Sequence, residues 1–405
     1  MSQINNSELH AQNSELPDGW RWVRLGEVCE INPSRPKNFT RSSETPTSFI
    51  PMAAVDEKTG TIAKPEVVPY SKVSKGYTYF EENDVLFAKI TPCMQNGKHV
   101  IARNLIDGIG FGTTEFHVLR SKKEVLSEWI YFFIRQPYFL REATAYFTGA
   151  VGQQRVPESF LSNYIIPLPP MEEQKHIALR IQELMQEVER ARTACERQLE
   201  AAKALPAAYL REVFEGEESK KWERKKLAEV CEMVMGQSPP SDSYKKEKIG
   251  LPFFQGKADF SIYFPIPQIW CSSPMRIAEP NDILISVRAP VGPVNMADQK
   301  CCIGRGLTAL RGKGQIDAWF LFFYFKCIEN SWKGRGSTFD AIRKDDLENI
   351  QITMPPIFEQ KRLASELKEK MAEVENLQFA IRNQQSAIDA LPQAILRKAF
   401  RGELL

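Results

Sequence analysis

Two long segments of the chain carry apolar residues in heptads and therefore predict two long helices. Each segment begins just after a proline pair, Pro169-Pro170 or Pro355-Pro356, and proline is tolerated in a first helical turn but rejected inside a helix. About 34 residues later, Leu205-Pro206 and Leu391-Pro392 are expected to break the helices, which gives each a length of about 50 Å. An apolar seam needs a partner, so we expect the two helices to pair.

The seam consists of two lines of residues in each segment. In the first segment the lines are Ile177, Leu184, Ala191 and Leu205, and Ile181, Val188, Cys195 and Ala202. In the second segment they are Leu363, Leu377 and Leu391, and Leu367, Val374, Ile381 and Ile388. Gln198 and Gln384 interrupt the first line at equivalent places, as does Lys370. Two interpretations stay open: the glutamines are buried and set the register, or the seam opens and both side chains meet water.

The segments before the two helices alternate short β-rich runs with Gly, Pro and Asn, which indicates α+β units with a mostly antiparallel sheet. The predicted strands are Ser48–Met52, Asp84–Ile90, Gly112–Leu119, Leu251–Phe254, Asp282–Val287 and Gly304–Leu310. The aromatic runs Trp129–Phe139 and Trp319–Asn330 are interpreted as core helices rather than base-stacking surfaces.

The chain contains an internal repeat. A shift of about 186 positions lays Ile166–Glu217 on Ile352–Glu403 without a gap, with roughly 24 of 52 positions identical. The upstream halves share only landmarks: Trp20–Glu30 corresponds to Trp222–Glu232, Asp84 to Asp282, and Trp129 to Trp319. We therefore expect two globular units of one fold with different surfaces, in which Asp84 and Asp282 cap turns.

Composition narrows the class of protein. Lys and Arg total 53 against 51 Asp and Glu, so a histone-like protein is excluded and any charge preference is local. The segments 16–165 and 219–350 carry a small basic excess. The start lacks the apolar stretch of an export signal, and the most apolar run, Trp319–Cys327, is interrupted by Lys326 and is too short to cross a bilayer. A cytoplasmic protein without a membrane partner is expected.

Motifs for cofactor chemistry are missing from the sequence. The 8 cysteines form no Cys-x-x-Cys pair and the 4 histidines lack ligand spacing, which predicts no metal site. A phosphate-binding loop and a dinucleotide fingerprint are absent, as is the Asn/Asp-Pro-Pro-aromatic site of amino-group methyltransferases. We predict a chain that needs no cofactor and is not itself an enzyme.

Two globular units alternating with two similar long helices, each opened by Pro-Pro-x-x-Glu-Gln-Lys at Pro169–Lys175 and Pro355–Lys361, resemble the specificity subunit of type I restriction-modification enzymes. The resemblance covers the chain from about Leu16 to Leu405. It implies an antiparallel coiled coil, a split double-stranded DNA target, and docking of modification subunits, two in number. It also implies that S-adenosylmethionine-dependent methylation belongs to those subunits and ATP-dependent cleavage to restriction subunits.

The resemblance divides the chain into five parts. They are a polar tail (1–15), target recognition domain 1 (16–165), helical spacer 1 (166–218), target recognition domain 2 (219–350) and helical spacer 2 (351–405).

Base reading is expected from polar loops, because Arg or Lys pairs with guanine and Gln or Asn with adenine in the major groove. The DNA-binding candidates are Lys89, Lys98, Gln153, Gln154, Arg155, Arg288, Arg305, Lys333 and Arg335. Gly149 and Gly152 would let the first loop approach DNA closely. Two other classes stay open: a coiled-coil scaffold with two protein-binding domains, and a self-sufficient methyltransferase or nuclease.

Overall fold

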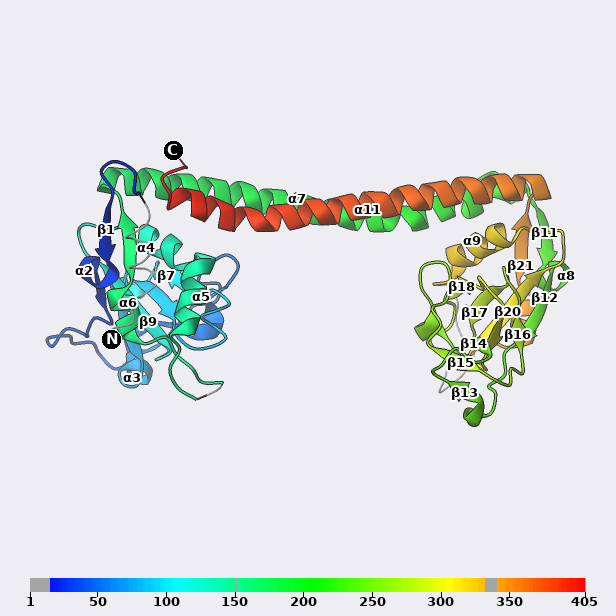
Figure 1. The fold of residues 1–405 in the computed structure, drawn as a ribbon, viewed down its shortest axis with the longest axis horizontal. Coiled ribbons are helices and arrows are strands. Elements are labelled where there is room, and N and C mark those ends of the chain that lie inside the picture. The colour runs from blue at the N-terminus through cyan, green and yellow to red at the C-terminus, as the bar shows by residue number, and fades with distance from the viewer. Residues whose placement is uncertain (1–14, 151, 332–340, 405) are drawn as a thin grey trace. The chain divides into compact units, whose positions relative to one another are not determined.

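The computed structural model describes residues 15–150, 152–331 and 341–404. The chain forms two compact units: unit 1 comprises Met1–Ala194 and Gln385–Leu405, and unit 2 comprises Cys195–Gln384. Each unit holds one globular part and a stretch of each of two long helices, α7 (Met171–Glu215) and α11 (Ile357–Ala399) (Figure 1).

The globular part of unit 1 contains two sheets and a two-stranded ribbon. One sheet is antiparallel, in the order β2 (Cys29–Ile31), β9 (Phe116–Ser121), β6 (Val85–Ala88) and β7 (His99–Ile101). The second has the order β4 (Glu66–Pro69), β3 (Pro46–Ile50), β8 (Ile109–Gly112) and β5 (Thr78–Glu81), with β3 and β8 parallel. The ribbon pairs β1 (Arg21–Arg24) with β10 (Ile165–Leu168). The short helices are α2 (Leu25–Val28), α3 (Tyr70–Val73), α4 (Ser127–Ile134), α5 (Pro137–Ala145) and α6 (Glu158–Asn163).

The globular part of unit 2 repeats this topology, with one additional strand in its second sheet. Its antiparallel sheet has the order β12 (Cys231–Met235), β20 (Leu307–Gly312), β17 (Ile283–Ser286) and β18 (Val294–Met296). The second sheet has the order β13 (Tyr244–Lys245), β15 (Ile269–Cys271), β14 (Leu251–Phe254), β19 (Cys301–Ile303) and β16 (Ile277–Ala278), again with one parallel pair, β14 and β19. The ribbon pairs β11 (Glu223–Lys226) with β21 (Gln351–Met354), and the short helices are α8 (Leu227–Val230), α9 (Ala318–Ile328) and α10 (Lys344–Glu348). The prediction of two α+β units with a shared fold is confirmed.

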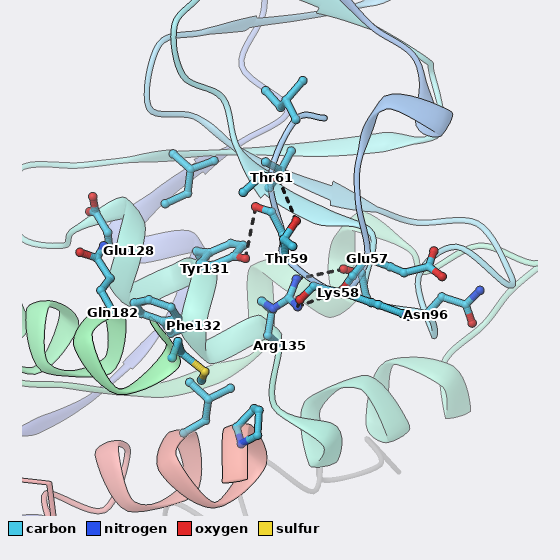
Figure 2. A pocket seen from close by; sticks show the side chains of 18 of the residues that line it. Glu57, Lys58, Thr59, Thr61, Asn96, Glu128, Tyr131, Phe132, Arg135 and Gln182 are labelled. Atoms are coloured by element: carbon cyan, nitrogen blue, oxygen red, sulfur yellow. Dashed lines mark hydrogen bonds between the residues drawn. The ribbon is translucent and has the colours of Figure 1, made fainter. Parts of the chain in front are cut away.

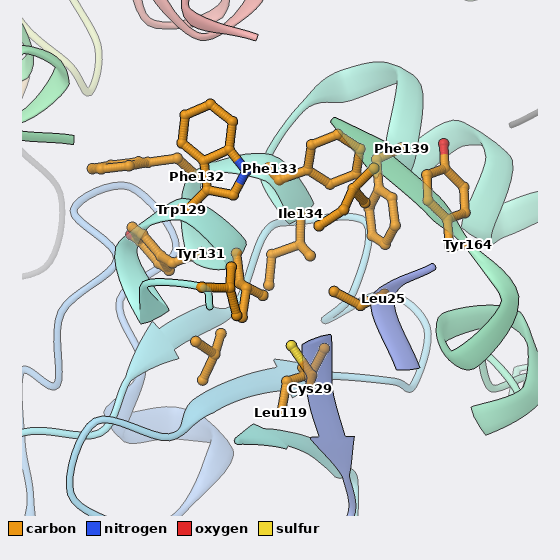
Figure 3. Close-up of a cluster of buried hydrophobic side chains, with 14 of the residues drawn as sticks. Leu25, Cys29, Leu119, Trp129, Tyr131, Phe132, Phe133, Ile134, Phe139 and Tyr164 are labelled. Carbon is orange, nitrogen blue, oxygen red and sulfur yellow. The ribbon is translucent and has the colours of Figure 1, made fainter. Parts of the chain in front are cut away.

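The predicted aromatic helices form the core of each unit, with one correction. The run expected as a single helix at Trp129–Phe139 is two helices, because Gln136 precedes Pro137 and the residue before a proline disfavours the helical conformation. Gln136 is extended, with φ −70° and ψ 135°. Figure 3 shows Trp129, Phe133, Phe139 and Tyr164 packed above Leu25 and Cys29.

The ends of the long helices complete these cores. In unit 1, the ring of Phe400 lies 4.4 Å from that of Trp129, which also contacts Trp20 at 5.5 Å. In unit 2, Phe214 lies 5.3 Å from Phe320, which also contacts Trp222 at 5.9 Å. The counterpart of Trp129 is therefore Phe320, so the landmark alignment of Trp129 with Trp319 is wrong by one residue.

The glutamine of the Pro-Pro-x-x-Glu-Gln-Lys motif fastens each long helix to its globular part. Gln174 is 1% exposed; its Oε1 accepts the Leu126 N–H, and its Nε2 donates to the carbonyls of Glu124 and Pro169, all at 2.9 Å. Gln360 is fully buried and makes the same bonds to Asp317, Gln315 and Pro355. An unpaired buried amide is costly, so three satisfied bonds fix how the helix begins.

The two long helices pair in antiparallel fashion inside each unit. In unit 2, Cys195 contacts Ile381 and Gln378 contacts Ala202, while Lys370 lies over the Tyr209 ring. In unit 1, Arg192 pairs with Asp389 at 2.9 Å. At successive contacts the residue numbers increase along α7 and decrease along α11, as expected of an antiparallel coiled coil.

Two details of the predicted helices need correction, and the open question of the two glutamines is answered. Both helices continue through Pro206 and Pro392 instead of breaking there. Leu210 and Phe214 beyond the first proline, and Leu396 and Phe400 beyond the second, pack into the cores.

One line of the seam is buried along its length in both helices. It consists of Ile181, Val188, Cys195 and Ala202 in α7 and of Leu367, Val374, Ile381 and Ile388 in α11. The other line is buried only at Ile177 and Leu363 within the seam; Leu377 and Leu391 are exposed. Gln198 and Gln384 are also exposed, so the seam opens there and the glutamines do not set the register from a buried position.

Candidate nucleic-acid interface

The structure brings together two of the candidate segments of unit 1, the one that follows β6 and the loop before α6. The Thr91 N–H donates to the Gln154 carbonyl at 3.1 Å, and the Val156 N–H donates to the Lys89 carbonyl at 3.0 Å. Gly149 and Gly152 have φ of +109° and +85°, a backbone region that side-chain-bearing residues rarely adopt. The loop therefore depends on its glycines for its shape, and it holds Gln153 exposed and Gln154 partly exposed.

Arg155 is occupied in holding this loop. Its guanidinium forms a two-pronged pair with Glu115, at 2.8 and 2.7 Å, and its third nitrogen donates to the Gln153 carbonyl at 2.8 Å. The hydrogen bonds from Arg155 lower the pKa of the Glu115 carboxyl. Arg155 thus ties the start of β9 to the turn that presents Gln153.

The two candidate lysines differ in their surroundings. Burial lowers the pKa of the Lys89 amino group, while the charge on Glu115 opposes that effect; within the described residues no carboxylate forms an ion pair with Lys89. The Lys98 amino group instead donates to the Val55 carbonyl at 2.9 Å and lies 3.4 Å from Glu57. Lys89 is therefore free to take a phosphate partner, whereas Lys98 is already bound within the protein.

A polar network beneath the loop was not predicted from the sequence. The His117 Nε2 donates to the Val156 carbonyl at 2.8 Å, and its Nδ1 lies 3.0 Å from the Asn32 amide, which also donates to Glu158 at 2.7 Å. Burial lowers the pKa of His117. Asn32 has φ +52°, and no sequence spacing connects it with residues 85 and 126 positions away. Asparagine is one of the few residues that adopt a positive φ readily, so Asn32 can indicate a turn in the sequence, but it does not indicate that the turn contacts His117 and Glu158.

The corresponding region of unit 2 is described only in part. Arg288 is exposed, and its backbone bridges Ala341 as Ile90 bridges Arg155 in unit 1. Arg305 is exposed in the turn before β20, and its N–H donates to the Ser238 hydroxyl at 3.4 Å. Lys333 and Arg335 lie outside the described residues.

The recurring carboxylates close turns, as predicted. Asp84 accepts the Glu81 N–H at 2.7 Å and a two-pronged contact from Arg120 at 2.9 and 2.7 Å. Asp282 repeats this with the Glu279 N–H and Arg311. Burial raises the pKa of Asp84, against the lowering effect of Arg120. Both carboxylates are fully engaged in holding a hairpin, so neither is available as a catalytic acid or base.

Across the described ranges, no group of three or more His, Cys, Asp or Glu side chains is arranged to hold a metal ion, and the cysteines are free thiols. Nor does any helix in that part of the chain have the length and apolarity to span a membrane.

Comparisons with known proteins converge on one family. The family model for the type I restriction modification DNA specificity domain matches twice, at residues 17–196 and 219–384. The MjaX specificity subunit of Methanocaldococcus jannaschii, a putative type I restriction enzyme component, is 33% identical over 341 residues, which cover 79% of this chain and 78% of the relative. The EcoEI specificity subunit of Escherichia coli is 41% identical over 172 residues, 42% of this chain and 28% of the relative.

Solved structures give the same result. A chain from a study of complex assembly and conformational transition in a type I restriction-modification system superposes with a TM-score of 0.80 and 36% identity, covering 96% of this chain and all of that one. The HsdS subunit of Thermoanaerobacter tengcongensis superposes with a TM-score of 0.76 and 36% identity, covering 96% and 99%.

Proposed function

Because this chain belongs to the type I restriction-modification DNA specificity family, we propose that its two globular parts read the two halves of a split DNA sequence. The observation that supports this most is one topology used twice with different residues at an equivalent place: Ile90 follows β6 in unit 1, and Arg288 follows β17 in unit 2. Two similar scaffolds with unlike polar edges suit two unlike half-sites. The recognition domains are 16–165 and 219–350, the helical spacers are 166–218 and 351–405, and 1–15 is a tail.

The loop geometry supports a different role for each candidate. Gln153 and Gln154 contact base edges, because an amide can pair with adenine and both side chains are accessible. Arg155 positions them through Glu115, and Lys89 contacts phosphate. Lys98 stabilises the domain from within. In the second domain Arg288 and Arg305 reach DNA together with Lys333 and Arg335.

The long helices dock the modification subunits. Phe358 and Phe379 on α11 are 69% and 65% exposed, and Leu179 on α7 is 56% exposed. Large apolar side chains at such exposure on a helix are suited to a protein partner. Two modification subunits then supply the S-adenosylmethionine chemistry and restriction subunits the ATP-dependent cleavage, while this chain is not catalytic and acts in the cytoplasm. We propose that the pairing residues Ile177, Ile181, Val188, Leu363, Leu367 and Val374 hold the spacer together, with Gln198 and Gln384 on its outer surface.

A selection from randomised duplex DNA tests this function. The chain is co-purified with a modification subunit, and the bound pool is sequenced. Two short half-sites at a fixed gap are expected. A pool without enrichment from an intact complex would instead favour a coiled-coil scaffold whose domains bind proteins.

A further inference from the structure

Unit 1 contains a cavity of about 1330 Å³ between its globular part and the long helices (Figure 2). Thr59 and Thr61 lie on the loop at one side, Tyr131 and Arg135 come from the end of α4, and Gln182 and Glu189 come from α7. The Arg135 guanidinium closes the loop side by donating to the carbonyls of Glu57 at 3.1 Å and Lys58 at 3.4 Å. We call this space the unit 1 hollow.

Aromatic side chains occupy the corresponding place in unit 2. The Tyr263 hydroxyl donates to Glu375 of α11 at 2.9 Å, and the Tyr263 ring lies 5.8 Å from that of Trp319. The Phe264 ring also contacts Trp319, at 5.9 Å, and the Lys368 amino group of α11 lies 3.9 Å from the centre of the Trp319 ring. The globular part of unit 2 is thus joined to α11 by a hydrogen bond and a cation–π contact.

The two places correspond residue by residue. Leu126 in unit 1 and Asp317 in unit 2 both bind the motif glutamine, so α4 and α9 align with Glu128 in the place of Trp319. The alignment is supported by Arg135 over Tyr131 and Lys326 over Phe322, which are the same contact in each unit. In the helical repeat, Gln182 of the first copy corresponds to Lys368 of the second, and Glu189 corresponds to Glu375.

The unit 1 residues at these positions do not bridge the hollow. Glu128 pairs with Arg103 on its own globular part, and Glu189 pairs with Arg192 on its own helix at 2.8 Å. The loop of unit 1 is held by Asp56, which accepts the N–H groups of Lys58 and Thr59 at 2.9 and 2.7 Å, and its segment Asp56–Thr61 carries no aromatic residue.

The Tyr263 loop is tied to the strands that lead toward the proposed DNA-binding edge. The Met296 N–H of β18 donates to the Tyr263 carbonyl at 2.8 Å, and the Asn295 side chain donates to the Ser261 carbonyl at 2.9 Å. β18 pairs with β17, which is followed directly by Val287 and Arg288. A displacement of Tyr263 against α11 would therefore be passed to the Arg288 turn.

We propose that Tyr263 and Trp319, bound to Glu375 and Lys368, are positioning residues that hold the second recognition domain on α11 and so set the gap length that the protein accepts between half-sites. The first recognition domain lacks this brace at the equivalent positions, where the unit 1 hollow lies instead. This inference rests on the proposed reading of a split DNA target.

Binding to duplexes of different gap length tests the brace. The two selected half-sites are placed at the native gap and at a gap one base pair longer. For the complex with the modification subunit, the affinity at the native gap is divided by the affinity at the longer gap, and this ratio is compared between variants. Tyr263→Phe removes only the hydroxyl, and we expect the ratio to fall at least about threefold while affinity at the native gap changes less than about twofold. The matched control is Tyr324→Phe, which loses a hydroxyl bonded to the Gln351 carbonyl at 3.0 Å and should leave the ratio unchanged.

Two further variants separate the brace from a general loss of stability. Tyr263→Phe combined with Glu375→Met should change the ratio no more than either substitution alone, because each removes the same hydrogen bond, the first its donor and the second its acceptor. An unchanged ratio in Tyr263→Phe and in Lys368→Gln, with the fold intact, overturns the brace while leaving the proposed function in place. If the wild-type complex selects no split target, the proposed function fails first and the brace fails with it.

Discussion

Cys195 and Ile381 occupy the same position in the two repeats, 186 residues apart, and they touch: the Cys195 thiol donates to the Ile381 carbonyl at 3.4 Å. Two antiparallel helices built from one repeat bring only a single position against its own counterpart, and in unit 2 that position is Cys195 against Ile381. Inside each unit, the end of a helix from one repeat packs on the globular part of the other repeat: Phe400 contacts Trp129 in unit 1, and Phe214 contacts Phe320 in unit 2.

The buried line of the seam should carry the stability of the helix pair. Ile381→Ala leaves a cavity beside Cys195 and should lower the free energy of unfolding by about 2–4 kcal/mol. Gln384→Ala, three residues further along and exposed, should change it by less than about 0.5 kcal/mol. Urea unfolding followed by circular dichroism distinguishes them, and equal effects would show that both lines of the seam are buried.

Gln174 of the Pro-Pro-x-x-Glu-Gln-Lys motif should stabilise the fold rather than contact DNA or a partner protein. Gln174→Met leaves the Leu126 N–H and two carbonyls without their partner, and we expect a loss of about 3 kcal/mol or more in unfolding free energy. Lys175→Met changes an exposed neighbour and should have little effect. Amide exchange at Leu126 reports the change directly, and unaltered protection there would contradict the assignment.

Acid should destabilise unit 1 through His99. The ring is fully buried and stacks on Phe87 at 4.4 Å; burial, aided by the charge on Arg135, lowers its pKa well below 6.5. Below pH 6.5 the unfolded chain binds a proton at His99 that the folded chain does not, so stability is complete above that pH and falls as pH decreases, by about 1.4 kcal/mol per pH unit. His117, whose pKa burial also lowers, acts in the same direction.

The measurement is unfolding free energy against pH between 7 and 5 for wild type, His99→Phe and the exposed control His176→Gln. His99→Phe should make the profile shallower, with His117 still contributing, and His176→Gln should leave it as steep as in wild type. A profile equally steep in all three variants would mean that the acid sensitivity arises elsewhere.

Much of the architecture follows from the sequence, because heptads and a gapless repeat report periodic burial directly. The pattern identified both seam lines, yet only the line through Cys195 and Ile381 is buried along its length, since how far two helices close depends on side chains opposite one another. The prolines at 206 and 392 indicate a break because proline has a very low helix propensity. Here the packing of the residues beyond each proline outweighs that local preference, and the helices continue.

The candidate site was harder to predict. Composition singled out Gln153 and Lys89, which the fold brings to one edge, but it could not separate Lys89 from Lys98 or show that Arg155 is held by Glu115. Those differences depend on partners 40 or more residues away in sequence. The same applies to the Tyr263–Glu375 bond, whose partners are 112 residues apart.

Lys89 and Lys98 should differ in how they affect DNA binding. Lys89→Met removes a phosphate contact and should reduce the slope of log affinity against log salt by about 0.9. Lys98→Met breaks an internal bond and should leave that slope unchanged while lowering the melting temperature. Salt titrations of both variants in complex with the modification subunit make the comparison, and equal slopes for all three proteins would remove Lys89 from the interface.

The most direct test of the central claim asks whether one domain reads one half-site. The selection from randomised duplex DNA is run in parallel for wild type and for a chain carrying Gln153→Ala and Gln154→Ala, each with the modification subunit. We expect one half-site to lose its base preference while the other half-site and the gap stay as in wild type. A variant in which both half-sites change together, or neither changes, would contradict it.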